Sequence, residues 1–165
     1  MNTDILVDEI IKAVKAGKKV ITFGVGGNAG NAMHFAAELA GKFEQYEKPL
    51  PCIDLVSNPC IVTAIAQDFG FEHVFERQIR GIAKPGDVLI GFSVSTNGLY
   101  LLKAFDEAVC TPCECFLICG RETRNLATDV FVMEFDNLDT PTVQEEQLKV
   151  IHQVCGKVKA SLSGK

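Results

Sequence analysis

Short apolar segments constrain the fold of this chain more than any other feature of its sequence. Four of them lie at 18–24, 86–93, 115–120 and 129–135, and read KKVITFG, GDVLIGFS, CFLICG and DVFVMEF. Their β-branched and aromatic residues, and the glycine or charged residues around them, are typical of strands buried on both faces. A further candidate strand lies around 51–55.

The segments between these runs repeat their apolar side chains at helical spacing. We expect helices over 4–16, 32–43, 61–67, 74–82 and 99–109. A last helix should begin at Thr140–Pro141, with Thr140 as its N-cap, and continue to residue 162. Strands that alternate with helices predict an α/β fold, a three-layer structure with a doubly wound parallel sheet. Residues 1–165 should form a single domain with one helix before the first strand.

The charge balance argues against two classes of partner. The net charge is −5 at pH 7 and there is no lysine- and arginine-rich cluster, so we expect no nucleic acid and no membrane surface as partner. The N-terminal residues include early acids and no long apolar run, which predicts no signal peptide, no membrane span and a cytoplasmic protein. The seven cysteines should then be reduced. The CTPC pair at 110–113 follows a helix instead of opening one, which disfavours a redox role.

A glycine-rich turn at 24–30 follows the first strand and precedes a helix. Gly24, Gly26 and Ala29 match the dinucleotide-binding fingerprint in form. That fingerprint also needs an acidic residue at the end of the next strand, whereas Glu44 comes before this strand and Asp54 comes later than expected. We therefore favour a general anion site, in which glycines admit the ligand to the N–H groups of the helix.

His34 and Glu38 follow the turn directly. Their i, i+4 spacing places both side chains on one face of the helix. An imidazole nitrogen and a carboxylate oxygen there can reach one metal ion or one substrate. The alternative is a surface pair without a role.

A second polar turn, SVSTNG at 93–98, follows another predicted strand. Its hydroxyl and amide groups suit a phosphate monoester, although they could also serve only to cap the next helix. Both turns should lie at the carboxyl edge of the sheet, where ligands bind in such folds. The last helix adds His152, and its geometry leaves open whether Gln144 or Glu145 shares a site with that residue.

Four stretches of the sequence resemble the SIS-domain (sugar isomerase) family, most closely the phosphoheptose isomerases. The family pattern G-x-G-G-S-x-x-D-A-x-H-x-x-x-E-L appears as GVGGNAGNAMHFAAEL at 24–39, and the aspartate–glycine segment appears as AQDFGFEHVF at 66–75. The loop GDVLxxxSTSGNS appears as GDVLIGFSVSTNG at 86–98, and the Q-E…H pattern of the last helix appears as QEEQLKVIH at 144–152.

The resemblance implies a flavodoxin-like SIS domain that interconverts sedoheptulose 7-phosphate and D-glycero-D-manno-heptose 7-phosphate. It implies a metal, usually Zn²⁺, held by His34, Glu38, Gln144 and His152, with Glu38 and His152 as the acid/base pair. It also implies a homotetramer, to which a second N-terminal helix contributes in the family. The implied substrate-binding residues are Val25, Gly26, Gly27, Asn28, Asp68, Ser93, Val94, Ser95, Thr96, Gly98 and Gln144.

Several positions depart from the family pattern while the metal set is intact. The usual residue is given in parentheses: Val25 (Asn), Asn28 (Ser), Asn31 (Asp), Lys42 (Arg), Val94 (Thr), Thr96 (Gly), Gly98 (Ser) and Gln147 (His). These changes favour a second hypothesis, a non-catalytic SIS module that binds a sugar phosphate or a protein partner, or an isomerase of another sugar phosphate. A regulatory branch of the family lacks the acid/base pair, so the presence of Glu38 and His152 favours an enzyme.

Overall fold

A parallel sheet forms the centre of the computed structural model, which describes residues 3–44, 48–121, 126, 129–136 and 139–163. In this part of the chain, the sheet has five strands in the order β2-β1-β3-β4-β5. The strands are β1 (Val20–Gly24), β2 (Cys52–Asp54), β3 (Val88–Ser95), β4 (Glu114–Arg121) and β5 (Val130–Glu134). This order is that of flavodoxin-like folds, so the predicted fold class is confirmed.

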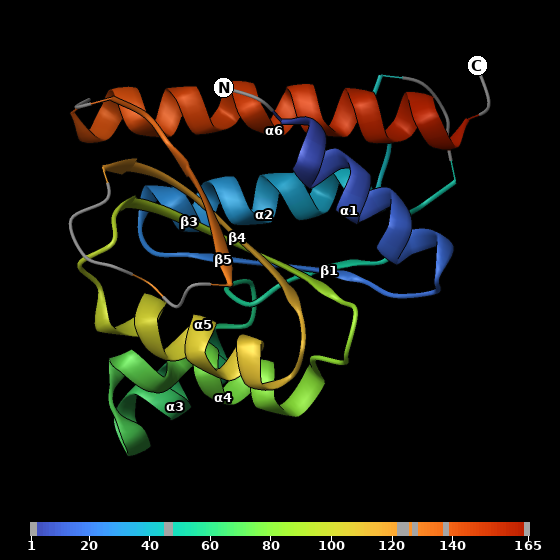
Figure 1. Cartoon of the computed structure of the whole chain (residues 1–165). Coiled ribbons are helices and arrows are strands. Elements are labelled where there is room, and N and C mark those ends of the chain that lie inside the picture. Colours follow the sequence, from blue (N-terminus) through green and yellow to red (C-terminus); the bar gives the residue numbers. More distant parts are fainter. Residues whose placement is uncertain (1–2, 45–47, 122–125, 127–128, 137–138, 164–165) are drawn as a thin grey trace.

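Helices cover both faces of the sheet, as Figure 1 shows. One layer consists of α1 (Asp4–Lys15), α2 (Gly27–Ala40) and α6 (Thr140–Leu162). The other consists of α3 (Pro59–Phe69), α4 (Val74–Ile82) and α5 (Leu99–Cys110), with a short 3₁₀ helix at Phe71–His73. Among the described helices, none is both long enough and apolar enough to cross a membrane.

Two apolar cores lie on either side of the sheet because successive strand side chains point to opposite faces. Val20 and Val88 pack against the layer of α1, α2 and α6. Their neighbours Ile21 and Leu89 pack against α4 and α5 instead. Burial on both faces explains why these strands read as continuous apolar runs.

The structure moves three of the predicted boundaries. The second helix begins at Gly27 and not at residue 32, because the chain passes from the left-handed turn at Gly26 (φ 62°) directly into the helix. The N-cap of α6 is Asp139 and not Thr140, since the Asp139 carboxylate accepts a hydrogen bond from the Thr142 N–H at 2.9 Å. Strand β3 extends to Ser95, so half of the predicted polar turn belongs to a strand.

A buried amide, that of Gln147, joins α6 to the sheet and to α2. Its Nε2 donates to the carbonyl oxygens of Ser93 at 2.8 Å and Ile118 at 3.0 Å, near the ends of β3 and β4. Its Oε1 accepts from Asn31 Nδ2 at 2.9 Å. Positions 31 and 147 both depart from the family pattern, and here they contact each other. Two positions that are ionisable in the family pattern are therefore occupied here by a hydrogen-bonded pair of uncharged amides.

Replacing Gln147 with leucine should lower the free energy of unfolding by about 1–3 kcal/mol, because two buried carbonyl groups lose their donor. The change can be measured by urea unfolding. Glu145→Gln, an exposed substitution on the same helix, is the control and should change stability by less than about 0.5 kcal/mol. An equal effect of the two substitutions would contradict the anchoring role of Gln147.

Candidate active site

Helices α2 and α6 bring three potential metal ligands together. His34 Nε2 lies 3.0 Å from Glu38 Oε1, and His152 Nε2 lies 3.4 Å from His34 Nε2. One ligand atom from each residue can be chosen so that all lie within 4.8 Å of one another. The structure thus places the predicted pair and the predicted distant histidine in one cluster.

The packing of the two helices explains why the cluster faces outward. Phe35 and Leu39 of α2 are buried, as are Ile151 and Val154 of α6, and all four belong to the same core. His34, one residue before Phe35 in α2, therefore lies at the edge of this contact and stays partly exposed. Glu38 and His152 occupy the same edge. A ligand can reach the cluster without opening the core.

Two imidazole nitrogens and a carboxylate oxygen are ligands that suit zinc. Catalytic zinc sites commonly hold the metal with three protein ligands of this kind and keep one position for water or substrate. The two histidine nitrogens face each other at 3.4 Å, an arrangement that a cation between them would stabilise. The residues present therefore fit a divalent transition metal.

Gln144 and Glu145 are distinguished by their surroundings. Glu145 is exposed, whereas Gln144 is partly buried and lies against the turn that begins α2. A Cβ added at Gly27 would lie 2.4 Å from Gln144 Oε1, which shows how closely the Gln144 amide approaches this turn. The position of Gln144 is consistent with the ligand set that the family resemblance implies.

The first loop uses many of its polar groups internally. The N–H groups of Asn28 and Ala29 donate to the carbonyl oxygens of Val25 and Gly26, at 3.2 and 3.0 Å. Gly26 and Gly27 are exposed, and Val25 is half-buried. Asn28 is buried, and its Oδ1 is the buried side-chain oxygen that finds no hydrogen-bond partner among the described residues. The asparagine that stands in place of the usual serine is therefore turned inward in this chain.

The second loop, at 93–98, also uses many of its polar groups in contacts within the protein. The Ser93 hydroxyl donates to the Ser95 carbonyl oxygen at 2.6 Å, and the Thr96 side chain is fully buried. Val94 offers no hydroxyl group, and Gly98 offers no side chain. Of the residues predicted here to contact substrate, Ser95 remains partly exposed and has a hydroxyl group.

Asp68 does not join the cluster within one chain. It lies on the exposed side of α3, and Figure 1 shows α3 across the sheet from α2 and α6. There it lines a cavity of about 440 Å³ together with Ile53, Phe69 and Arg77. The family resemblance implies a substrate-binding role for this aspartate, but the fold places it in the other helical layer.

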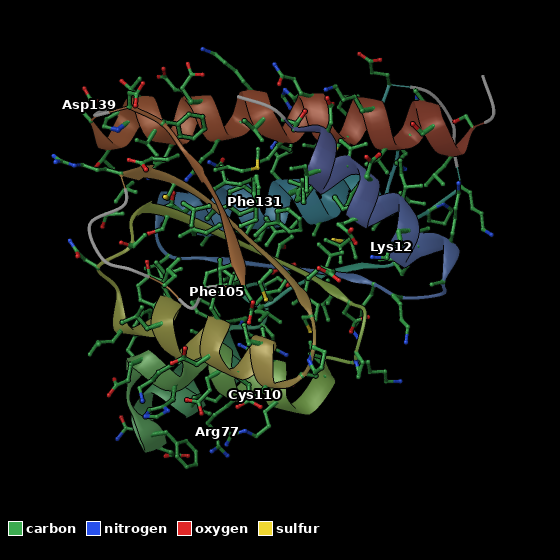
Figure 2. The ribbon with its side chains drawn as sticks, in the orientation of Figure 1. Lys12, Arg77, Phe105, Cys110, Phe131 and Asp139 are labelled. Carbon is green, nitrogen blue, oxygen red and sulfur yellow. The ribbon has the colours of Figure 1, made fainter. Side chains whose placement is uncertain are left out.

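Three of the cysteines, Cys115, Cys119 and Cys155, are buried, whereas Cys60 and Cys110 are exposed. Figure 2 shows Cys110 at the end of α5, on the side of the sheet away from α6. Burial raises the pKa of its neighbour Cys113 to about 11, and the charge of Asp87 adds to this rise. Cys155 is fully buried one turn after His152, and burial raises the pKa of its thiol as well. Protonated thiols are poor nucleophiles and metal ligands, in agreement with a structural role.

Tyr100 is a residue that the sequence analysis missed. Its phenol oxygen lies 3.5 Å from Ser93 Oγ, at the base of the second loop. Tyr100 lies among the apolar residues of α5, and a tyrosine in such a stripe normally indicates packing. The sequence feature that could have indicated Tyr100 is Gly98, two residues earlier, where the family pattern has serine.

Comparison with known proteins identifies the family of this chain. The SIS domain family matches residues 2–110. A probable phosphoheptose isomerase from Thermoplasma acidophilum is 36% identical over 156 residues, which cover 93% of this chain and 85% of the relative. A phosphoheptose isomerase from Geotalea daltonii is 38% identical over 160 residues, covering 96% and 83% of the two chains.

Solved structures show the same likeness. The phosphoheptose isomerase from Neisseria gonorrhoeae superposes with a TM-score of 0.88 at 28% identity, over 96% of this chain and 85% of that one. For the enzyme from Francisella tularensis the TM-score is 0.89 at 23% identity, over 94% and 83%, which supports the fold alone. The chain therefore belongs to the SIS-domain family and, within it, to the phosphoheptose isomerases, a group of phosphosugar isomerases.

Proposed function

We propose that this protein is a zinc-dependent aldose–ketose isomerase that converts sedoheptulose 7-phosphate to D-glycero-D-manno-heptose 7-phosphate. The observation that carries the proposal is the cluster of His34, Glu38 and His152 between α2 and α6. The relatives named phosphoheptose isomerase support the substrate. Reduced thiols and the lack of a membrane-spanning helix among those described are compatible with a cytoplasmic enzyme.

In this reaction a proton moves between two neighbouring carbons of the open-chain sugar. From ketose to aldose, a base removes a proton from C1, an enediol forms, and an acid returns a proton to C2. A second proton moves from the C1 oxygen to the C2 oxygen. We assign these transfers to Glu38 and His152, which approach from different helices and so can act on different atoms of one substrate.

His34, Glu38, Gln144 and His152 would hold the metal, which would polarise the carbonyl and hydroxyl oxygens at C1 and C2. Because a carboxylate bound tightly to a cation is a weak base, Glu38 would act as the base only if it held the cation weakly.

Glu38→Gln and His152→Gln should each reduce the turnover of sedoheptulose 7-phosphate by roughly 100-fold or more, because each removes a group that transfers protons. Thermal unfolding of both variants should stay close to that of the unchanged protein. Gln153→Ala, an exposed neighbour of His152 on α6, is the matched control and should retain activity. Normal turnover in both glutamine variants would refute the acid/base assignment.

His34→Ala should also reduce the zinc content of the purified protein, measured by mass spectrometry of the metal, from about one ion per chain to near zero. Chelation should abolish turnover of the unchanged protein, and added zinc should restore it. His73→Ala is the control, because His73 lies in the other helical layer and contacts Glu76 at 2.6 Å. Equal zinc loss in both variants would place the metal elsewhere.

The altered loops favour a second candidate function. Val94 and Gly98 remove two hydroxyl groups from the loop that corresponds to the phosphate loop of the family. If the zinc-loaded, folded protein does not convert sedoheptulose 7-phosphate, the ligand is another sugar phosphate, or the protein is a non-catalytic SIS module with a protein partner. Direct turnover measurements on a panel of sugar phosphates separate these functions.

We also propose that the protein forms a homotetramer. Helix α3 supports assembly, because none of its residues is buried although most are apolar. Ile61 and Phe69 are 41% and 49% exposed, and Ile53 of the edge strand β2 is 43% exposed. Light scattering should give about four times the 17.9 kDa mass of the chain, and Ile61→Glu with Phe69→Glu should reduce it. A 17.9 kDa species for the unchanged protein would refute this proposal.

A further inference from the structure

Tyr100 lies in the first turn of α5, directly below the second loop. Its phenol oxygen is 3.5 Å from Ser93 Oγ, at the limit of hydrogen bonding. The ring is held edge-on against two phenylalanines, with centroids 6.0 Å from Phe71 and 5.9 Å from Phe75. These contacts fix the position of the phenol oxygen, while its O–H bond can still rotate.

The ring occupies the space that a side chain at position 98 would need. A Cβ added at Gly98 would lie 2.4 Å from Tyr100 Cε1 and 2.9 Å from Cζ. The backbone of Gly98 does not itself require glycine, because its φ of −76° suits any residue. The tyrosine ring therefore explains why the serine of the family pattern is absent here.

The hydrogen bonds of the Ser93 hydroxyl group determine which residue donates in its contact with Tyr100. The Ser93 proton is committed to the Ser95 carbonyl oxygen at 2.6 Å, so in the contact with Tyr100 the phenol is the donor. A phenol that donates over such a long distance can turn to a stronger acceptor. An anion at the start of α5 would be that acceptor, since the first N–H groups of a helix have no partner within it.

We propose that Tyr100 supplies the phosphate-binding hydroxyl group that Gly98 lacks, and that its ring is the reason for the glycine. The proposal rests on the proposed function, because it assumes a sugar phosphate in this loop. It makes Tyr100 a binding residue for the phosphate group and leaves proton transfer to the cluster between α2 and α6. Gly98 and Tyr100 then form one coupled arrangement, in which position 100 supplies the hydroxyl group that position 98 lacks.

Tyr100→Phe tests the hydroxyl group, because it keeps the ring and removes only the oxygen. Calorimetry with inorganic phosphate should show binding about tenfold weaker, the effect of losing one hydrogen bond to a charged group. The KM for sedoheptulose 7-phosphate should rise by a similar factor, while kcat stays within about twofold. Leu99→Ala, an exposed neighbour without a polar group, is the control and should change neither value.

Gly98→Ser tests the steric coupling without any assumption about function. Alone it should lower the unfolding temperature, because its side chain meets the ring. In the Tyr100→Ala background the same change should cost much less, and it should improve phosphate binding severalfold over Tyr100→Ala alone. Equal destabilisation in both backgrounds would overturn the coupling.

The outcomes separate this proposal from the function on which it rests. If the unchanged protein binds phosphate and Tyr100→Phe binds it equally well, the role of Tyr100 is wrong and the isomerase proposal is unaffected. If Tyr100→Ala binds phosphate more tightly than the unchanged protein, the ring obstructs the loop and the proposal is overturned. If the unchanged protein binds neither phosphate nor any sugar phosphate, both proposals fail.

Discussion

The contact between α2 and α6 is the constraint on which the candidate site depends. His34 and His152 are 118 positions apart in the chain, and their ring nitrogens lie 3.4 Å apart because these two helices pack side by side. A small rotation of α6 would separate the histidines and leave Glu38 with one partner. The chemistry of the cluster therefore requires that α6 be fixed both along its axis and around it.

Apolar packing alone does not fix a helix in this way. A stripe of valine and isoleucine tolerates sliding, because its contacts are not directional. The buried amide of Gln147 supplies the direction, since its hydrogen bonds reach β3, β4 and α2 together. The glutamine–asparagine pair is uncharged, so it avoids the desolvation cost of an ionised aspartate–histidine pair in the same place. Its geometry should also be independent of pH.

Periodicity in the sequence predicts the layers of this fold well, because buried parallel strands leave an unmistakable apolar pattern. It predicts the ends of elements poorly. The start of α2 at Gly27 depends on a left-handed glycine, and the cap of α6 depends on which of two adjacent residues turns its oxygen inward. Both are decided by a few backbone angles that residue type biases only weakly. Helical spacing alone placed His34 beside Glu38, but His152 joined them only through the resemblance.

Contacts between distant departures from the family pattern were beyond sequence reasoning. Asn31 and Gln147 each look like an isolated loss of an ionisable group, yet in the fold they complete one hydrogen-bonded pair. Gly98 looks like a lost hydroxyl group, yet the ring of Tyr100 fills its space. In both cases a second residue, distant or nearby in the chain, accommodates the departure at the same point in space. The Asn31–Gln147 pair holds α6 against α2, and this packing is what brings His34 and His152 together.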